Sequence, residues 1–161
     1  MKKCISILLL CLFAFNSCEK DDFCTENPVT PNLIIRFFDK NDITSLKNVS
    51  QFSVIAENKT DSLFTNQSID SIAIPINGNA SETVYTLKIN DKEGTLTDNK
   101  YATLRINYNS VEDYVSRSCG FRYIFKNIEL SITDNEWIDS ISNKSIPEIN
   151  NQIRSHVQIF H

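Results

Sequence analysis

The stretch Thr103-Leu104-Arg105-Ile106-Asn107-Tyr108 alternates polar and apolar side chains without a break. A period of two places all the apolar side chains on one face of an extended chain, whereas a helix would scatter them around its surface. The stretch therefore predicts a β-strand with one face in a core and the other toward water.

The same alternation recurs from Asn32 onward, with no long segment of helical period. Asn and Asp residues separate the runs, because both tolerate left-handed backbone and bond to their own backbone. Asn77-Gly78 and Glu93-Gly94 predict hairpin turns. About seven to nine short strands at this spacing predict an all-β fold, an antiparallel β-sandwich of Ig-like or Greek-key type, with a closed barrel as the alternative. The expected inward-facing residues are Leu33, Ile35, Phe37, Phe52, Val54, Ala56, Ile72, Ile74, Ile76, Tyr85, Leu87, Ile89, Leu104, Ile106, Tyr108, Phe121, Tyr123, Phe125, Ile128, Leu130, Ile132, Val157 and Ile159.

One segment, residues 135–151, departs from this pattern. Trp137, Ile138 and Ile141 have helix-like spacing, and Pro147 then interrupts it. We expect a loop with one helical turn, followed by a last strand over residues 153–160. Trp137 is expected to pack over one end of the sandwich, and a ligand platform is the alternative.

The N-terminus has the pattern of a bacterial lipoprotein signal. Lys2 and Lys3 precede an apolar run over residues 5–15, and Ser17-Cys18 follows it. A spanning helix needs roughly 20 apolar residues, so this shorter run predicts a signal peptide. Cys18 would then be the lipidated residue, although Phe15 stands where such signals usually carry Leu. The alternatives are an ordinary signal peptide cut elsewhere and a buried N-terminal strand.

Cleavage before Cys18 predicts a signal peptide over residues 1–17, a lipidated polar tether over 18–31 and one β-sandwich domain over 32–161. Loss of 17 residues, two of them lysines, takes the chain from 161 to 144 residues and its net charge from −4 to −6. An acidic chain offers no electrostatic attraction to nucleic acid or anionic lipid. The lipid is therefore the only membrane attachment that we expect.

The five cysteines reduce to one pair after cleavage. Cys4 and Cys11 leave with the leader, and Cys18 takes the lipid. Cys24 and Cys119 remain in an oxidising compartment, which favours a disulfide between them. That disulfide would close a loop of 95 positions.

A reactive thiol at Cys119 is the rival hypothesis. Arg117 and Arg122 flank it and would lower its pKa. No well-placed general base accompanies it, so the disulfide is the preferred prediction.

Residues that support catalysis or metal binding are sparse. The two histidines are His156 and His161, and neither G-x-S-x-G nor H-E-x-x-H occurs. We therefore expect no catalytic residue, no metal site and no cofactor. Two carboxylate pairs suit sugar chemistry, Glu112 with Asp113 and Glu136 with Asp139, but they are better interpreted as solvated turn acids.

Three tripeptides consist of Asp-Ser followed by a large aliphatic residue, and they resemble the O-glycan acceptor pattern of Bacteroidota envelope proteins. The alternative is that Asp-Ser simply starts a strand. The candidate acceptors are Ser62, Ser71 and Ser140.

Several longer stretches resemble an uncharacterised family of Bacteroidota envelope lipoproteins, a domain of unknown function. They are Cys18-Glu19-Lys20-Asp21-Asp22-Phe23-Cys24, Pro31-Asn32-Leu33-Ile34-Ile35-Arg36-Phe37-Phe38-Asp39, Asp70-Ser71-Ile72-Ala73-Ile74-Pro75-Ile76-Asn77 and Val115-Ser116-Arg117-Ser118-Cys119-Gly120-Phe121. The spacing of Cys24 and Cys119 is the most specific part. The resemblance implies an envelope lipoprotein and weakly favours an outer-membrane barrel protein as partner, but it implies no activity.

Together these features predict a lipid-anchored, non-catalytic interaction protein of the outer membrane, on either the cell surface or the periplasmic face. The acidic Glu19-Lys20-Asp21-Asp22 run favours the surface. The alternative is a protein that binds or processes glycans, with Trp137, Tyr101, Tyr108 and Tyr123 as its aromatic candidates.

Overall fold

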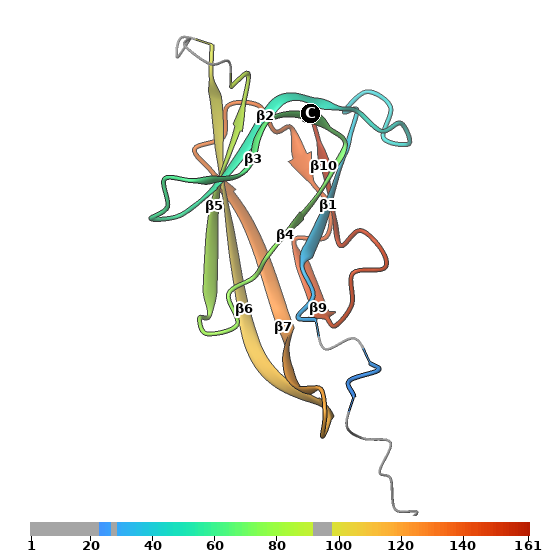
Figure 1. The fold of residues 1–161 in the computed structure, drawn as a ribbon. Coiled ribbons are helices and arrows are strands. Elements are labelled where there is room, and N and C mark those ends of the chain that lie inside the picture. The colour runs from blue at the N-terminus through green and yellow to red at the C-terminus, as the bar shows by residue number, and fades with distance from the viewer. Residues whose placement is uncertain (1–22, 27–28, 92–97) are drawn as a thin grey trace, which may run out of the picture. The chain divides into compact units, whose positions relative to one another are not determined.

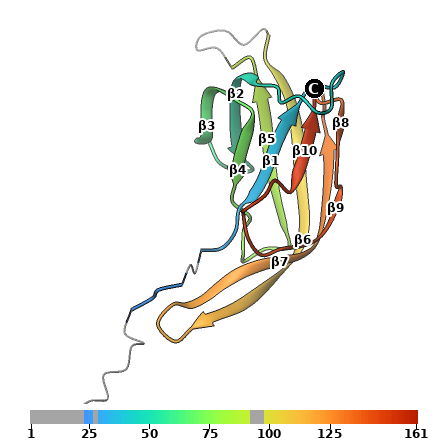
Figure 2. The same ribbon diagram turned by 90° about the vertical axis from the view of Figure 1, so that its right-hand side faces the viewer.

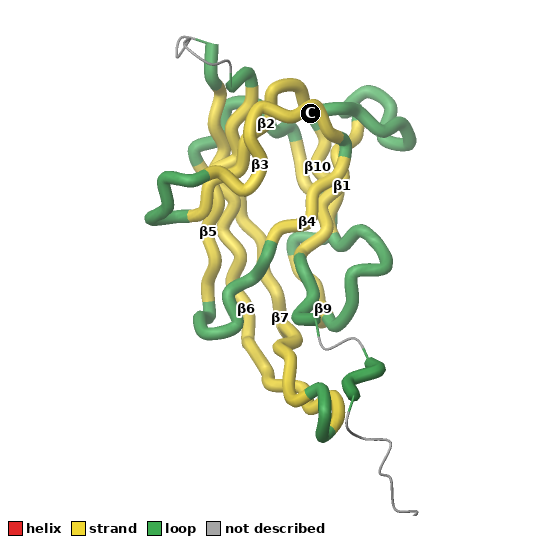
Figure 3. Tube along the Cα trace, viewed as in Figure 1, coloured by secondary structure: helices red, strands yellow, loops and turns green. Residues whose placement is uncertain are grey.

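The computed structural model describes residues 23–26, 29–91 and 98–161. Within these ranges the chain forms ten β-strands and no helix (Figures 1 and 3). The strands are β1 (Leu33–Phe38), β2 (Val49–Ala56), β3 (Ser62–Ile69), β4 (Ser71–Ile74), β5 (Glu82–Ile89), β6 (Lys100–Ser116), β7 (Gly120–Thr133), β8 (Ser140–Ile141), β9 (Ser145–Ile149) and β10 (Val157–Phe160).

The strands form two sheets, which confirms the predicted β-sandwich. One sheet has the order β4-β1-β10-β8 and the other the order β3-β2-β5-β6-β7-β9 (Figure 2). The first strand pairs with the last in parallel, with Ile35 opposite Val157 and Phe37 opposite Ile159. The β1–β4, β2–β3, β2–β5, β5–β6, β7–β9 and β8–β10 pairings are antiparallel.

The apolar faces of the two sheets share one core, as the alternation predicts. Leu104 and Ile106 are buried, whereas Thr103 and Arg105 between them are partly exposed. Burial of this apolar area supplies the main stabilisation of the fold. The largest fully buried side chains are Phe37, Phe52, Phe125, Leu33, Ile35, Ile74, Leu87, Leu104, Ile106, Ile128, Ile149 and Ile159.

The chain divides into two compact units by its internal contacts. Of the first unit, the structure describes residues 23–26 and Tyr114–Phe121. The second unit consists of Val29–Asp113 and Arg122–His161, and it holds the core.

Asn77-Gly78 does not form a hairpin turn, so that prediction was wrong. It lies between β4 and β5, which belong to different sheets, and the connection therefore crosses from one sheet to the other. Side chains of the second sheet hold this crossing: Tyr85 Oη donates to the Pro75 carbonyl at 2.7 Å, and Tyr108 Oη donates to the Asn77 carbonyl at 2.7 Å. Glu93-Gly94 lies outside the described residues, between the paired strands β5 and β6.

Residues 135–151 form no helical turn, and this prediction was also wrong. The Asn135 side chain bends the chain, because its Oδ1 accepts from the backbone N–H of Trp137 at 3.3 Å and of Ile138 at 2.8 Å. Strands β8 and β9 follow. Pro147 is accommodated because β9 is at a sheet edge, where a missing N–H leaves no ladder bond unmade.

Candidate functional site: the disulfide-linked hairpin tip

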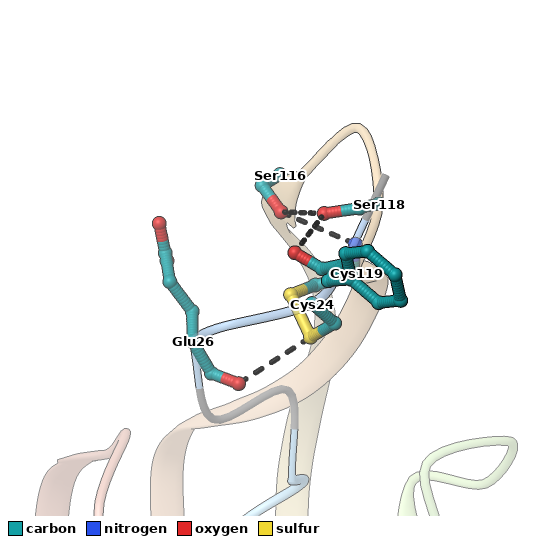
Figure 4. The surroundings of a disulfide bond; sticks show 6 residues. Cys24, Glu26, Ser116, Ser118 and Cys119 are labelled. Carbon is teal, nitrogen blue, oxygen red and sulfur yellow. Dashed lines mark hydrogen bonds between the residues drawn. A yellow bond between two sulfur atoms is a disulfide. The ribbon is translucent and has the colours of Figure 1, made fainter. Parts of the chain in front are cut away.

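The predicted pairing of Cys24 with Cys119 is confirmed. The two Cα atoms are 4.8 Å apart, within the usual range for a disulfide, and the bond joins positions 95 residues apart (Figure 4). The competing hypothesis of a reactive Cys119 thiol is therefore wrong. Cys18 lies outside the described residues, so its lipidation stays a prediction.

Cys119 occupies a tight turn between β6 and β7, made by residues 117–119. Ser116 Oγ accepts from the Cys119 backbone N–H at 3.1 Å, and Ser118 Oγ donates to the Phe23 carbonyl at 3.3 Å (Figure 4). Gly120 has a φ of +72°, a conformation that costs glycine little. We call residues Tyr114–Phe121 the hairpin tip. The disulfide and a side-chain hydrogen bond together hold residues 23–24 on it.

This unit displays aromatic side chains to solvent. Phe23 is 80% exposed, Tyr114 59% and Phe121 64%, and the rings of Tyr114 and Phe121 meet edge to face with centroids 5.2 Å apart. Scattered exposed apolar residues are ordinary, but here three of the twelve described positions of one unit are exposed aromatic residues, and we call Phe23, Tyr114 and Phe121 its aromatic patch. Such patches mark surfaces that contact another molecule.

The histidines are part of the packing. The His156 imidazole accepts from the Ile34 backbone N–H at Nδ1, 3.0 Å away, and its Nε2 is 3.0 Å from the Asn151 carbonyl, so the neutral Nε2–H form satisfies both partners. Burial lowers the pKa of His156 and of His161. His161 meets the rings of Phe37 and Trp137 edge to face.

The carboxylate pairs are engaged in local contacts. Asp113 Oδ2 accepts from Arg122 Nε at 2.8 Å, and Glu136 Oε2 accepts from the Tyr101 backbone N–H at 2.7 Å. Asp139 lines a cavity of about 320 Å³ with Leu130, Ile138 and Lys144, among others, and its backbone N–H donates to the Phe160 carbonyl. Glu136 is therefore directed to a strand end and Asp139 borders a hollow, so the two do not form a facing pair across a cleft.

The aromatic candidates for glycan binding also have structural roles. Trp137 packs against Phe37 and Phe52, with ring centroids 6.3 and 6.1 Å away, which confirms the packing hypothesis. Tyr123 packs so closely on Gly78 that a Cβ there would be 2.2 Å from its ring. Tyr108 Oη bonds with Thr83 Oγ1 at 2.6 Å as well as with the sheet crossing. Of the four candidates, Tyr101 is an exposed ring, with Lys88 Nζ 5.9 Å from its centroid.

The three candidate acceptor serines lie in different environments. Ser71 in β4 and Ser140 in β8 are exposed, and both strands are edges of the four-stranded sheet. Ser62 at the start of β3 is partly buried, and its Oγ donates to the Val54 carbonyl at 2.8 Å and also contacts the Phe64 carbonyl. Only the first two hydroxyl groups are presented to solvent.

One polar cluster was missed by sequence reasoning. Ser53 is fully buried, and its Oγ donates to Asp91 Oδ2 at 2.5 Å while accepting from the Asn66 backbone N–H at 2.9 Å. Lys88 Nζ is 2.6 Å from Asp91 Oδ1, and the hydrogen bonds from Lys88 and Ser53 lower the pKa of Asp91. Asp91 follows β5 in sequence and resembles a turn acid, so no local signal points to this role. The cluster fastens β2, β3 and the end of β5 together.

The residues that the structure describes contain neither a membrane-spanning helix nor a metal-binding cluster. No helix there has the length and hydropathy needed to cross a bilayer. The same residues contain no group of three or more His, Cys, Asp or Glu side chains placed to hold a metal ion.

Comparison with known families gives one match. The model of a family of unknown function, DUF6452, matches residues 51–161, which is more than half of the chain. No curated protein and no solved structure matches the chain.

Proposed function

Because the chain belongs to the family of unknown function DUF6452, we propose its role from its own residues: a non-catalytic interaction protein, anchored to the outer membrane by lipid on Cys18. The observation that carries the anchor is the order of charge, short apolar run and Ser17-Cys18 at the N-terminus. Several acyl chains on one cysteine make such anchoring durable, since each buried CH₂ contributes about 0.8 kcal/mol. The disulfide supports the proposal, because disulfides persist in oxidising compartments such as the periplasm and the cell surface.

The edge strands support a binding role. An edge strand presents unpaired N–H and C=O groups, and natural sheets protect such edges with short strands, proline or charge. β4 and β8 are short, and β9 contains Pro147 and Glu148, the latter 3.7 Å from Lys126. β3 has eight residues, Ser-Leu-Phe-Thr-Asn-Gln-Ser-Ile, with neither proline nor charge.

We therefore assign β3 as the edge that pairs with an extended segment of a partner protein. Register shifts in its pairing with β2 bend the strand, so a partner would pair with only part of it. Leu63, 47% exposed, is an apolar contact on this strand.

Two experiments test the proposal. Labelled palmitate should appear on the full-length protein in cells and be absent from Cys18→Ala, which should also leave the membrane fraction. A photo-cross-linking amino acid in place of Leu63 should capture a specific envelope protein, whereas the same group in place of Ser145, an exposed residue of β9, should not. Unlabelled wild-type protein would refute the anchor, and equal cross-linking at both positions would refute the β3 edge.

We further propose that Ser71 and Ser140 carry any O-glycan, and that Ser62 does not, because its hydroxyl is bound to backbone carbonyls. Intact-mass measurement of the native protein should show hexose-sized increments that Ser71→Ala and Ser140→Ala remove. Increments that persist in the double variant and disappear in Ser62→Ala would contradict the assignment.

A further inference from the structure

We propose that the exposed aromatic patch of the first unit, Phe23, Tyr114 and Phe121, inserts into the lipid headgroup layer of the membrane to which the chain is anchored. The inference rests on the proposed lipidation of Cys18. It adds a second, non-covalent membrane contact and assigns the hairpin tip as the membrane-facing part of its unit.

The covalent structure limits how far the patch can be from the bilayer. Six residue steps separate Cys18 from Cys24, and a fully extended chain spans about 3.3–3.6 Å per residue, or roughly 20 Å in all. The disulfide then joins Cys24 directly to Cys119, with 4.8 Å between their Cα atoms. Without it, the tip would be connected to the lipid only through the rest of the chain. With it, the Cα atom of Cys119 stays within roughly 26 Å of the Cα atom of the lipidated residue in every conformation of the tether.

The side chains in this unit suit that layer. Tyr concentrates at membrane interfaces because its ring is amphipathic, and Phe is among the apolar residues that interfacial segments bury at the boundary between headgroups and acyl chains. Phe23 directly precedes Cys24, and Phe121 follows Cys119 by two residues, so both rings are close to the disulfide in sequence. Tyr114 packs on Phe121. Their exposed fractions of 80%, 64% and 59% show that little of the protein covers them. The occupant that the tether brings to this patch is lipid.

The net charge of the mature chain predicts which lipid surface suits it. A charge of −6, derived from −4 by loss of two lysines, disfavours strongly anionic membranes. The contact should therefore be apolar in character and form on zwitterionic lipid.

Tryptophan fluorescence tests the inference on the intact lipidated protein. Trp137 is the one tryptophan of the chain and packs against the core, so it supplies a constant background. Phe121→Trp reports on the tip, and Ile43→Trp is the matched control, because Ile43 is 65% exposed and belongs to the second unit. Each protein is reconstituted in phosphatidylcholine–phosphatidylethanolamine vesicles, with and without lipid brominated near the headgroup.

We expect emission from Phe121→Trp to shift to the blue on reconstitution and to be quenched by bromolipid about threefold more than emission from Ile43→Trp. Replacing Cys24 and Cys119 by serine in the Phe121→Trp protein should reduce that quenching toward the control value. Circular dichroism should confirm that the sheets persist in this variant.

The outcomes separate the two proposals. Intact mass is measured first: absence of the lipid increment on Cys18 refutes the anchor and this inference together. Lipidated protein in which both tryptophans are equally weakly quenched refutes the tip contact and leaves the anchor standing. The Phe121→Trp protein is also reconstituted in vesicles that contain outer-membrane proteins. A blue shift there that is absent in vesicles of lipid alone refutes the inference too, because the tip would then contact a membrane protein.

Discussion

The two compact units of this chain are ordered by different means. In the second unit, Phe37, Phe52 and Trp137 pack together in a core that two sheets enclose. In the first unit the aromatic rings face solvent, and a disulfide with a few hydrogen bonds holds the described segments together. Aromatic residues therefore stabilise one unit by burial, while the other keeps them exposed and depends on a covalent bond.

Strand β7 shows the same contrast within one element. Phe121, Tyr123 and Phe125 occupy alternate positions of β7. Their exposed fraction falls along the strand: Phe121 is 64% exposed, Tyr123 is partly buried and Phe125 is fully buried. Only the last of the three contributes a fully buried ring. A ring at the tip end of β7 is thus available for contact with another molecule at little cost in stability.

The sharpest test of this contrast compares truncations of a core ring and a tip ring. Phe52→Ala should lower the free energy of unfolding by about 3–5 kcal/mol, because the site is fully enclosed and a cavity remains. Phe121→Ala should change it by no more than about 0.5 kcal/mol. Urea unfolding of both variants measures the difference, and similar losses would show that the tip ring is part of a core.

Removal of the disulfide tests the other half of the contrast. Replacing Cys24 and Cys119 by serine should cost about 2–4 kcal/mol, because the bond closes a loop of 95 positions in the unfolded chain. The same comparison with Cys24→Ser alone, which leaves a free thiol, controls for polarity. Hydrogen exchange should show that protection is lost first at the hairpin tip; uniform loss across both sheets would contradict the separation into two units.

The core could be predicted from sequence because burial follows a local pattern. Leu33, Ile35 and Phe37 alternate in the sequence and are all fully buried. The parallel pairing of β1 with β10 has no local signal, since the choice of a distant partner depends on the whole topology. β3 was missed for a related reason: most of its side chains are polar and exposed, and its place is set by pairing with β2.

The candidate site was only partly predictable. The two cysteines that remain after the predicted cleavage were enough to predict the disulfide. The exposed patch could not be predicted, because Phe121 follows the alternation of a core residue. Phe121 lies beside the turn, where its ring meets Tyr114 and still stays 64% exposed. Alternation predicts a shared face of a strand, but it does not predict where along the strand that face is covered.

A smaller effect is expected where β7 contacts the sheet crossing. Gly78→Ala should destabilise the protein by about 1–3 kcal/mol, because the new methyl group would overlap the Tyr123 ring. The cost should shrink in a Tyr123→Ala background, which a double-mutant cycle by thermal unfolding would reveal. Equal costs in both backgrounds would mean that the backbone of the crossing, and not the ring, resists the substitution.

The smallest effect concerns pH and also separates the units, because both histidines lie in the second. Burial lowers the pKa of His156 below its ordinary 6.5, so the unfolded chain binds a proton more readily than the folded one. The stability that depends on neutral His156 is therefore complete above about pH 6.5 and declines as the pH falls below it, since a proton on Nδ1 would displace the Ile34 N–H. The loss in free energy of unfolding between about pH 7.5 and 5.5 should be about 1 kcal/mol or less, the net contribution of one hydrogen bond.

The variant His156→Asn tests this assignment, because it keeps an acceptor and does not titrate in this range. It should flatten the pH dependence of thermal unfolding, with a remaining slope from His161, whose pKa is lowered in the same direction. An unchanged slope in His156→Asn would show that another group governs the pH dependence of the core.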